Sequence, residues 1–259
     1  MSAADAQLVD GLPSWAFMFV IVLCRVGAAC MLIPGYGEAE VPMTVRAGAV
    51  LALTLLLLPV LAGQLPPAPD DVWRDLAMVA AELCAGLFLG WIARLALLAL
   101  PLGGQFIATL TGQASVLQPD AVLGAQGTAI SRMLGLAATV LVFATGLHAL
   151  PLAALAGSYR VIPAGALLPA GDTAATVVAG VGTLFALALR LAAPFVLAGI
   201  VWHAALAALG RLVPQVQVFF LSAPAQLLGG LALLGLLGAT LLGVWREEAG
   251  AALAALPGL

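Results

Sequence analysis

Four ionisable side chains stand inside long apolar runs of the sequence, and they are the residues best placed to do chemistry: Arg25, Glu82, Arg94 and Arg190. A charge at bilayer depth costs a few kcal/mol even on lenient insertion scales, so each must pair, reach a headgroup or face a wet cavity. Glu82 and Arg94 are separated by ~18 Å along a straight helix and cannot pair with each other. The spacing predicts ion pairs between helices or subunits, or a polar channel lining. Snorkelling from segment ends stays open as the alternative.

Other reactive residue types are scattered in the sequence. His148 and His203 lie in apolar surroundings with no second His or carboxylate nearby, so we interpret them as buried structural histidines. The three cysteines show no CxxC or Cys/His spacing and are interpreted as small core residues. The sequence contains no HExxH, GxSxG, P-loop or Rossmann glycine pattern. We therefore predict a protein that is not an enzyme, with no catalytic residue, no cofactor and no metal site.

The composition is that of a membrane protein. Of the 259 residues, 64% are hydrophobic and 8% are charged, and the mean hydropathy is +1.17. A soluble domain has about 25% charged residues, so too few polar side chains are present here to cover a water-soluble surface. The net charge of −3 argues against nucleic acid as a partner, because phosphate binding needs a clustered basic face.

Proline, glycine and charge divide the chain into apolar segments that are long enough, in most cases, to cross a bilayer as helices. The sequence predicts a single all-α domain over residues 1–259, a membrane-associated bundle of about six long, kinked helices arranged as hairpins. Short tails are expected at 1–13 and 246–259. Kinks are expected at Pro101, Pro194 and Pro224. The predicted segments are 14–33, 47–63, 75–100, 132–156, 174–208 and 217–245.

The connection between residues 101 and 131 is unusual, because it is polar, almost uncharged and rich in Gly, Ser, Thr and Gln. Irregular backbone at membrane depth is tolerated only inside protein or beside water. The loop from Thr111 to Gln126 is therefore our candidate for a moving or pore-facing element, and an ordinary surface loop is the alternative. Gly86 and Gly90 form a GxxxG pattern, which predicts close approach of another helix.

Several short elements recur in an order that resembles the FliR/SctT family of type III secretion export-gate proteins. An Arg in the first apolar helix precedes a Pro and a VP-x-x-x-R element, and then an EL-x-x-G-x-x-x-G helix. A G-x-F-I segment, a Gly and His, an S-x-x-x-x-P-x-G turn and an R-x-x-PQ-x-x-x-F signature follow. Besides Arg25 and Glu82, the matching positions are Pro34, Pro42, Arg46, Gly86, Gly90, His148, Pro163, Arg211, Pro214, Gln215 and Pro224.

The resemblance implies an architecture of FliP-like and FliQ-like hairpin halves and a role in the flagellar protein export gate. It implies FliP and FliQ homologues as partners, with FlhB and FlhA homologues, exported unfolded flagellar proteins and lipid as further contacts. The implied location is the bacterial inner membrane, in the flagellar basal body. The four buried ions become candidate subunit-interface residues. The implied pore plug comprises Gly112, Gln113, Ser115, Val116, Leu117, Gln118 and Pro119.

Two alternatives stay open. One is an export protein of the injectisome, the SctT-like branch of the same family. The other is a small-molecule permease, which should show repeated halves and a polar site at the membrane midplane. Neither of these permease features is evident in the sequence.

Overall fold

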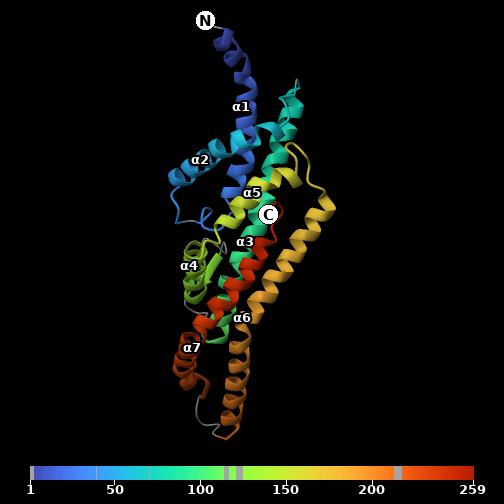
Figure 1. Cartoon of the computed structure of the whole chain (residues 1–259). Coiled ribbons are helices and arrows are strands. Elements are labelled where there is room, and N and C mark those ends of the chain that lie inside the picture. The colour runs from blue at the N-terminus through green and yellow to red at the C-terminus, as the bar shows by residue number, and fades with distance from the viewer. Residues whose placement is uncertain (1–2, 39, 70, 114–116, 121–124, 213–217) are drawn as a thin grey trace. The chain divides into compact units, whose positions relative to one another are not determined.

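The structure is a computed structural model that describes residues 3–38, 40–69, 71–113, 117–120, 125–212 and 218–259. Seven α-helices dominate it (Figure 1). They are α1 (Ala3–Cys30), α2 (Met43–Leu61), α3 (Val72–Leu110), α4 (Ala129–Ala144), α5 (Ala149–Val161), α6 (Ala170–Leu212) and α7 (Val218–Ala254). A short 3-10 helix, η1 (Ala62–Gln64), follows α2. The predicted all-α membrane bundle is confirmed.

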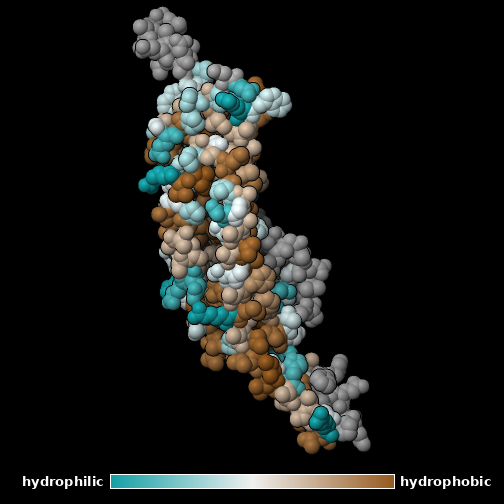
Figure 2. Space-filling model, turned by 90° about the vertical axis from the view of Figure 1, so that its right-hand side faces the viewer, coloured by the Kyte–Doolittle hydropathy of each residue, from teal (hydrophilic) through white to brown (hydrophobic). Residues whose placement is uncertain are grey.

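Length and apolarity make these helices fit to cross a membrane. Within the described ranges, five helices qualify, and counting the bent pair α4 and α5 as one span raises the number to six. Exposed aliphatic side chains are abundant on them, and Leu56, Val60 and Leu236 are between 68% and 78% exposed. Figure 2 shows such apolar side chains spread over much of the visible surface. An apolar exterior of this kind requires lipid or protein around it.

The chain packs as two compact units. The first comprises residues 1–94, 146–178 and 252–259, and the second comprises 95–145 and 179–251. Because α3, α6 and α7 each contribute residues to both, neither unit is a contiguous domain of the usual kind. The sequence predicted one domain and gave no sign of this subdivision.

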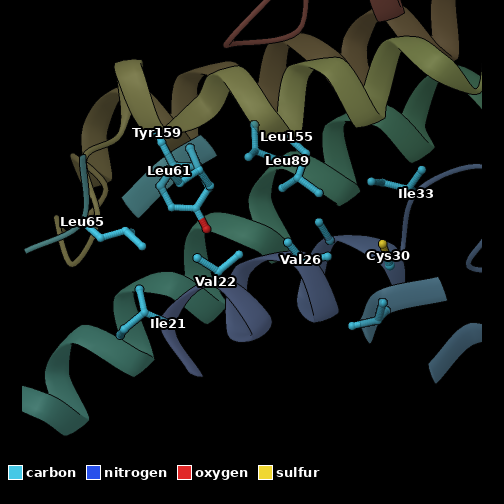
Figure 3. Close-up of a cluster of buried hydrophobic side chains, with 12 residues drawn as sticks. Ile21, Val22, Val26, Cys30, Ile33, Leu61, Leu65, Leu89, Leu155 and Tyr159 are labelled. Carbon is cyan, nitrogen blue, oxygen red and sulfur yellow. The ribbon is translucent and has the colours of Figure 1, made fainter. Parts of the chain in front are cut away.

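The core of the first unit is a cluster of mostly aliphatic side chains around the C-terminal half of α1. Val22 and Val26 of α1 meet Leu61 at the end of α2, Leu89 of α3 and Leu155 of α5 (Figure 3). Val22, Val26 and Leu155 are almost completely buried. At the C-terminal end of the chain, Leu253 and Leu256 are also buried, and the backbone at Gly258 adopts a positive φ of 101° beside Gly157 of α5.

In the second unit, close helix contacts and hydrogen bonds connect α3 with α4. A Cβ atom at Gly104 of α3 would lie 3.0 Å from the Cα of Ser131 in α4, so this crossing depends on glycine. The Ser131 hydroxyl donates to the Pro101 carbonyl at 2.8 Å. A second hydrogen bond links the same segments one turn further along α3: the side chain of Gln105 accepts from the backbone N–H of Thr128 at 3.1 Å.

The polar connection between α3 and α4 contains an element that the sequence did not predict. Strands β1 (Leu117–Asp120) and β2 (Ala125–Thr128) pair antiparallel, with Leu117 opposite Thr128 and Asp120 opposite Ala125. Thr128 then caps α4, because its hydroxyl accepts from the backbone N–H of Ser131 at 3.3 Å. Part of the expected irregular loop is therefore a short β-ribbon.

Two further expectations need correction. The segment predicted at 132–156 is two helices with a 68° bend between them, because Gly146 takes a positive φ of 77° that ends the first helix. The expected tails at 1–13 and 246–259 are largely helical, since α1 begins at Ala3 and α7 continues to Ala254. Pro101, Pro194 and Pro224, where kinks are predicted, lie inside the helices α3, α6 and α7.

Candidate functional site

The most concentrated polar site among the described residues surrounds Arg25, in the C-terminal part of α1. Its side chain and that of Glu82 in α3 are completely buried. The Nε atom of Arg25 donates to Oε2 of Glu82 at 2.7 Å, and one terminal nitrogen donates to Oε1 at 2.9 Å. This two-pronged geometry is the strongest arrangement available to an arginine and a carboxylate. Arg25 and Glu82 thus pair between two helices of the same chain.

The other terminal nitrogen of Arg25 joins a third element. It donates to the carbonyl of Ile162 at 2.9 Å and to the hydroxyl of Ser158 at 3.2 Å, at the end of α5. The ring of Tyr159 covers the guanidinium, with its centroid 3.9 Å from Cζ. The ion pair, Ser158 and Tyr159 thus form a junction of α1, α3 and α5, which we call the Arg25 junction.

The carboxylate of Glu82 also fixes the turn that follows α5. Its Oε1 accepts from the backbone N–H of Gly165 at 2.7 Å. Gly165 has a positive φ of 76°, and a Cβ atom there would lie 2.9 Å from the side chain of Met78. The position needs glycine for both reasons. Pro163 begins this turn, and its carbonyl accepts from the N–H of Ala166.

Buried charges of this kind are stable only while every partner is present. The Arg25 junction sits in an apolar environment, where an unpaired ion costs several kcal/mol. Both oxygens of Glu82 accept hydrogen bonds from Arg25, and one also accepts from Gly165. A carboxylate occupied in this way is suited to holding helices together. It is poorly suited to taking a proton from a substrate.

A second, less buried pair lies just beyond the C-terminal end of α1. Arg94 in α3 contacts Glu38 with a nitrogen–oxygen distance of 3.3 Å, and the two side chains are 11% and 4% exposed. Arg46 in α2 donates to the backbone carbonyl of Glu38 at 2.7 Å. The link between α1 and α2, which runs from Met31 to Pro42, therefore contacts α3 through Arg94 and α2 through Arg46. Pro42 is the residue immediately before α2.

The GxxxG pattern packs within the chain. A Cβ atom at Gly86 would collide with the carbonyl oxygen of Arg25 and would lie 2.9 Å from the Cβ of Ala28. At Gly90 it would lie 2.7 Å from the carbonyl oxygen of Ala29. The two glycines let α3 approach α1 closely at the level of the ion pair, which accounts for both sequence features together.

Arg190 differs from the other three ions. It lies in the second unit, on α6, and its terminal nitrogen contacts the Oε1 of Glu248 on α7 at 2.6 Å. The two side chains are 66% and 45% exposed. This pair is on the outside of the chain and is available for a further contact.

The predicted plug residues are placed only in part. Gly112 has a positive φ of 74° and ends α3, and the N–H of Gln113 donates to the carbonyl of Ala108 at 2.8 Å in the manner of a Schellman cap. The side chain of Gln113 donates to the Thr111 hydroxyl at 3.3 Å. Leu117, Gln118 and Pro119 lie in the backbone of β1. Ser115 and Val116 lie outside the described residues.

The remaining predicted residues are spread over the fold. His148 immediately precedes α5, and His203 contacts the carbonyl of Gly199 through Nδ1 at 2.7 Å. Arg211 lies in the last turn of α6 and Pro224 lies within α7. Pro214 and Gln215 fall outside the described residues. Across the described ranges, no group of three His, Cys, Asp or Glu side chains is arranged to hold a metal ion.

Sequence reasoning missed the partners of the ions. Ser158, Tyr159 and Glu248 belong to the sites that Arg25 and Arg190 form, and Glu38 is the partner of Arg94. Only the S-x-x-x-x-P-x-G spacing hinted that Ser158 is significant. Long-range pairing cannot be read from one sequence, because any of several carboxylates satisfies the same requirement for a counter-ion.

Comparison with known proteins identifies the family of this chain. The family model of bacterial export proteins, family 1, matches residues 16–252. The chain is 31% identical over 232 residues to the flagellar biosynthetic protein FliR of Caulobacter vibrioides, a match covering 90% of this chain and 92% of the relative. FliR of Bacillus subtilis is 26% identical, covering 85% and 84%, and FliR of Escherichia coli is 24% identical, covering 86% and 85%.

The match extends over nearly the whole chain, including both units and the Arg25 junction. The chain therefore belongs to family 1 of the bacterial export proteins. Its relatives place it among the components of the flagellar export apparatus. The five or six apolar helices agree with a multi-pass membrane protein in that apparatus.

Proposed function

We propose that this chain forms part of the protein-conducting pore of the flagellar export gate, in the bacterial inner membrane. FliP and FliQ homologues are its expected direct partners, and FlhB and FlhA homologues its neighbours. The observation that carries the proposal is the family match over residues 16–252, which covers α2 to α6, the second half of α1 and nearly all of α7. The large exposed apolar surface supports it, because that surface needs partner subunits or lipid to cover it.

The proposed role is structural, without a catalytic step. The best candidate for a reactive group, Glu82, is buried and hydrogen-bonded to Arg25 and Gly165. Arg94 and Glu38 are likewise paired. These ions fix the relative positions of helices, as a pore wall requires. Energy for export would come from other parts of the apparatus.

Different ions have different proposed roles. Arg25, Glu82 and Arg94 act within the chain, because their partners and their burial are internal. Arg190 and Glu248 are the proposed contact with another subunit, because an exposed ion pair on an apolar helix surface needs polar surroundings. The segment 112–119 is the proposed plug of the closed pore.

Deletion of the gene tests the function as a whole. We expect cells without the protein to lack filaments and to stop swimming while growing normally, and plasmid-borne protein to restore both. Electron microscopy and a soft-agar motility assay provide the readouts. Normal filaments in the deletion strain would refute a role in flagellar export.

A second experiment tests the plug. Replacement of residues 112–119 by a Gly/Ser linker of equal length should raise the ion conductance of the membrane in cells that carry the assembled gate. Replacement of residues 66–69, in the link after η1, serves as the control. Equal conductance in the two strains would show that residues 112–119 do not close the pore.

A further inference from the structure

The polar connection between α3 and α4 starts at a point that α7 holds. Leu110 is the last residue of α3, and its carbonyl oxygen accepts a hydrogen bond from the side-chain amide of Gln226 on α7 at 3.1 Å. Carbonyls in the last turn of a helix have no partner inside the helix, so this amide satisfies a group that α3 itself leaves free. The two residues are 116 positions apart in the sequence, and both belong to the second unit.

Glycine at position 230 brings α7 close enough to α3 for this hydrogen bond. A Cβ atom at Gly230 would collide with the Cβ of Thr111 and would lie 2.6 Å from its Cγ2. Thr111 is buried, and its hydroxyl donates to the carbonyl of Ile107 at 2.8 Å. Because Thr111 is fixed to its own helix, it leaves no room for a larger residue at position 230. We call Leu110, Thr111, Gln226 and Gly230 the α3–α7 contact.

The returning end of the same connection is fixed separately. Thr128, at the end of β2, donates to the side-chain oxygen of Gln105 from both its backbone N–H and its hydroxyl, each at 3.1 Å. Gln105 and Leu110 are separated by about 8 Å along α3. The connection therefore leaves α3 and returns to it within a short distance. Its outgoing end is held by α7, and its returning end is held by α3 itself.

We propose that Gln226 and Gly230 are positioning residues for the pore plug, which keep residues 112–119 in the closed position by fixing the end of α3. The inference rests on the proposed plug and adds the contact that holds it. Gly112, the first plug residue, lies beside the same amide, because a Cβ atom there would be 3.5 Å from Cδ of Gln226. Since Gly112 directly follows Thr111, loss of the α3–α7 contact lets the start of the plug move.

The contact itself is tested in the purified full chain in mild detergent, by hydrogen–deuterium exchange of the peptide that spans residues 108–113. Gln226→Met keeps a side chain of similar length and removes the donor. The backbone N–H groups of Thr111 and Gln113, which close the last turns of α3, should then exchange about fivefold faster, the factor for one typical hydrogen bond. Leu228→Met is the control, because Leu228 is on the same helix and 66% exposed, and it should exchange like the parent chain.

Three further variants identify the donor and the close approach. Gln226→Lys restores a donor on an unbranched side chain, and a cation at a helix C-terminus is favourable, so exchange should return to within about twofold of the parent chain. Gly230→Ala should accelerate exchange at least as much as Gln226→Met, because its methyl group collides with Thr111. Gly229→Ala is the matched control, since a Cβ atom at Gly229 meets nothing within 4 Å, and its exchange should not change.

Membrane conductance then shows whether the contact positions the plug. In cells that carry the assembled gate, Gln226→Met and Gly230→Ala should raise the ion conductance part of the way to that of the strain with a Gly/Ser linker at residues 112–119. Leu228→Met and Gly229→Ala should not raise it. Conductance is compared at equal amounts of assembled protein, because a variant that merely folds poorly would form fewer gates and would not leak.

Several results would overturn the proposal. Unchanged exchange in Gln226→Met, or equal exchange in Gln226→Met and Gln226→Lys, would show that the hydrogen bond does not hold the end of α3. Faster exchange without a leak, in an experiment where the linker strain leaks, would leave the proposed plug intact and show that other contacts position it. A linker strain without a leak would refute the plug itself, and with it any role of Gln226 in positioning it.

Discussion

Two ion pairs among the described residues stand in opposite environments. In the first unit, Arg25 and Glu82 are completely buried, share two hydrogen bonds and draw in Ser158, Ile162 and Gly165. In the second unit, Arg190 and Glu248 form a single contact with most of the arginine exposed. The same chemical pair therefore serves two purposes. A buried pair fixes three helices in one arrangement, whereas an exposed pair contributes little to stability and leaves polar groups available to a partner.

The largest loss of stability is expected when one partner of the buried pair is removed. Glu82→Gln should destabilise the chain by about 3–5 kcal/mol, because Arg25 would remain buried without a counter-ion. The measurement is the thermal unfolding midpoint of the purified protein in mild detergent. Cells with this variant should contain little of the protein and should not swim. An unchanged midpoint would mean that solvent reaches Arg25 and that the junction is not as buried as described.

A smaller effect is expected from the helix contact beside that junction. Gly86→Ala places a methyl group against the carbonyl of Arg25, and overpacking of this kind costs about 1–3 kcal/mol. Gly48→Ala on α2 is the control, because a Cβ atom there meets nothing within 4 Å. The same detergent unfolding measurement should rank Gly86→Ala clearly below Gly48→Ala. Equal unfolding midpoints for the two variants would show that α1 and α3 can move apart to accept the methyl group without a loss of stability.

The smallest effect on stability is expected at the exposed pair. Arg190→Ala should change the unfolding free energy by less than about 1 kcal/mol, the usual range for exposed ion pairs. If the pair contacts another subunit, the same variant should reduce co-purification of the FliP and FliQ homologues and should weaken motility. The exchange Arg190→Glu with Glu248→Arg keeps the internal pair and reverses its direction. If Arg190→Ala is stable, co-purifies normally with the FliP and FliQ homologues and supports normal swimming, the Arg190–Glu248 pair does not contact another subunit.

Composition and helix length predicted most of the fold. Six apolar segments were located, five of them as the helices α1, α2, α3, α6 and α7, because long runs without charge leave few other structures in a bilayer. The break between α4 and α5 was missed, since Gly146 resembles the many other glycines of this chain. The β-ribbon was missed because its strands are only four residues each and carry polar residues.

The sequence predicted that the charged residues in apolar helices need partners, and it did not predict which residues those partners are. Arg25 and Glu82 stood out because charge is rare here, and the physics of burial required partners for them. Which partners they have depends on how α1, α3 and α5 approach one another, and a pattern within one segment does not contain that information. The sequence also treated Arg190 like the other ions. Only the packing distinguishes an exposed pair from a buried one.

The residues of the Arg25 junction are far apart in the sequence, and this distance has a consequence for biosynthesis. Arg25 is made 57 residues before Glu82 and 133 residues before Ser158. At a synthesis rate of about 5–20 residues per second, the arginine waits roughly 3–11 s for its counter-ion. During that interval the nascent first helix carries a cation without its counter-ion. It must therefore stay near water, headgroups or the insertion machinery until α3 is synthesised and Glu82 can pair with Arg25.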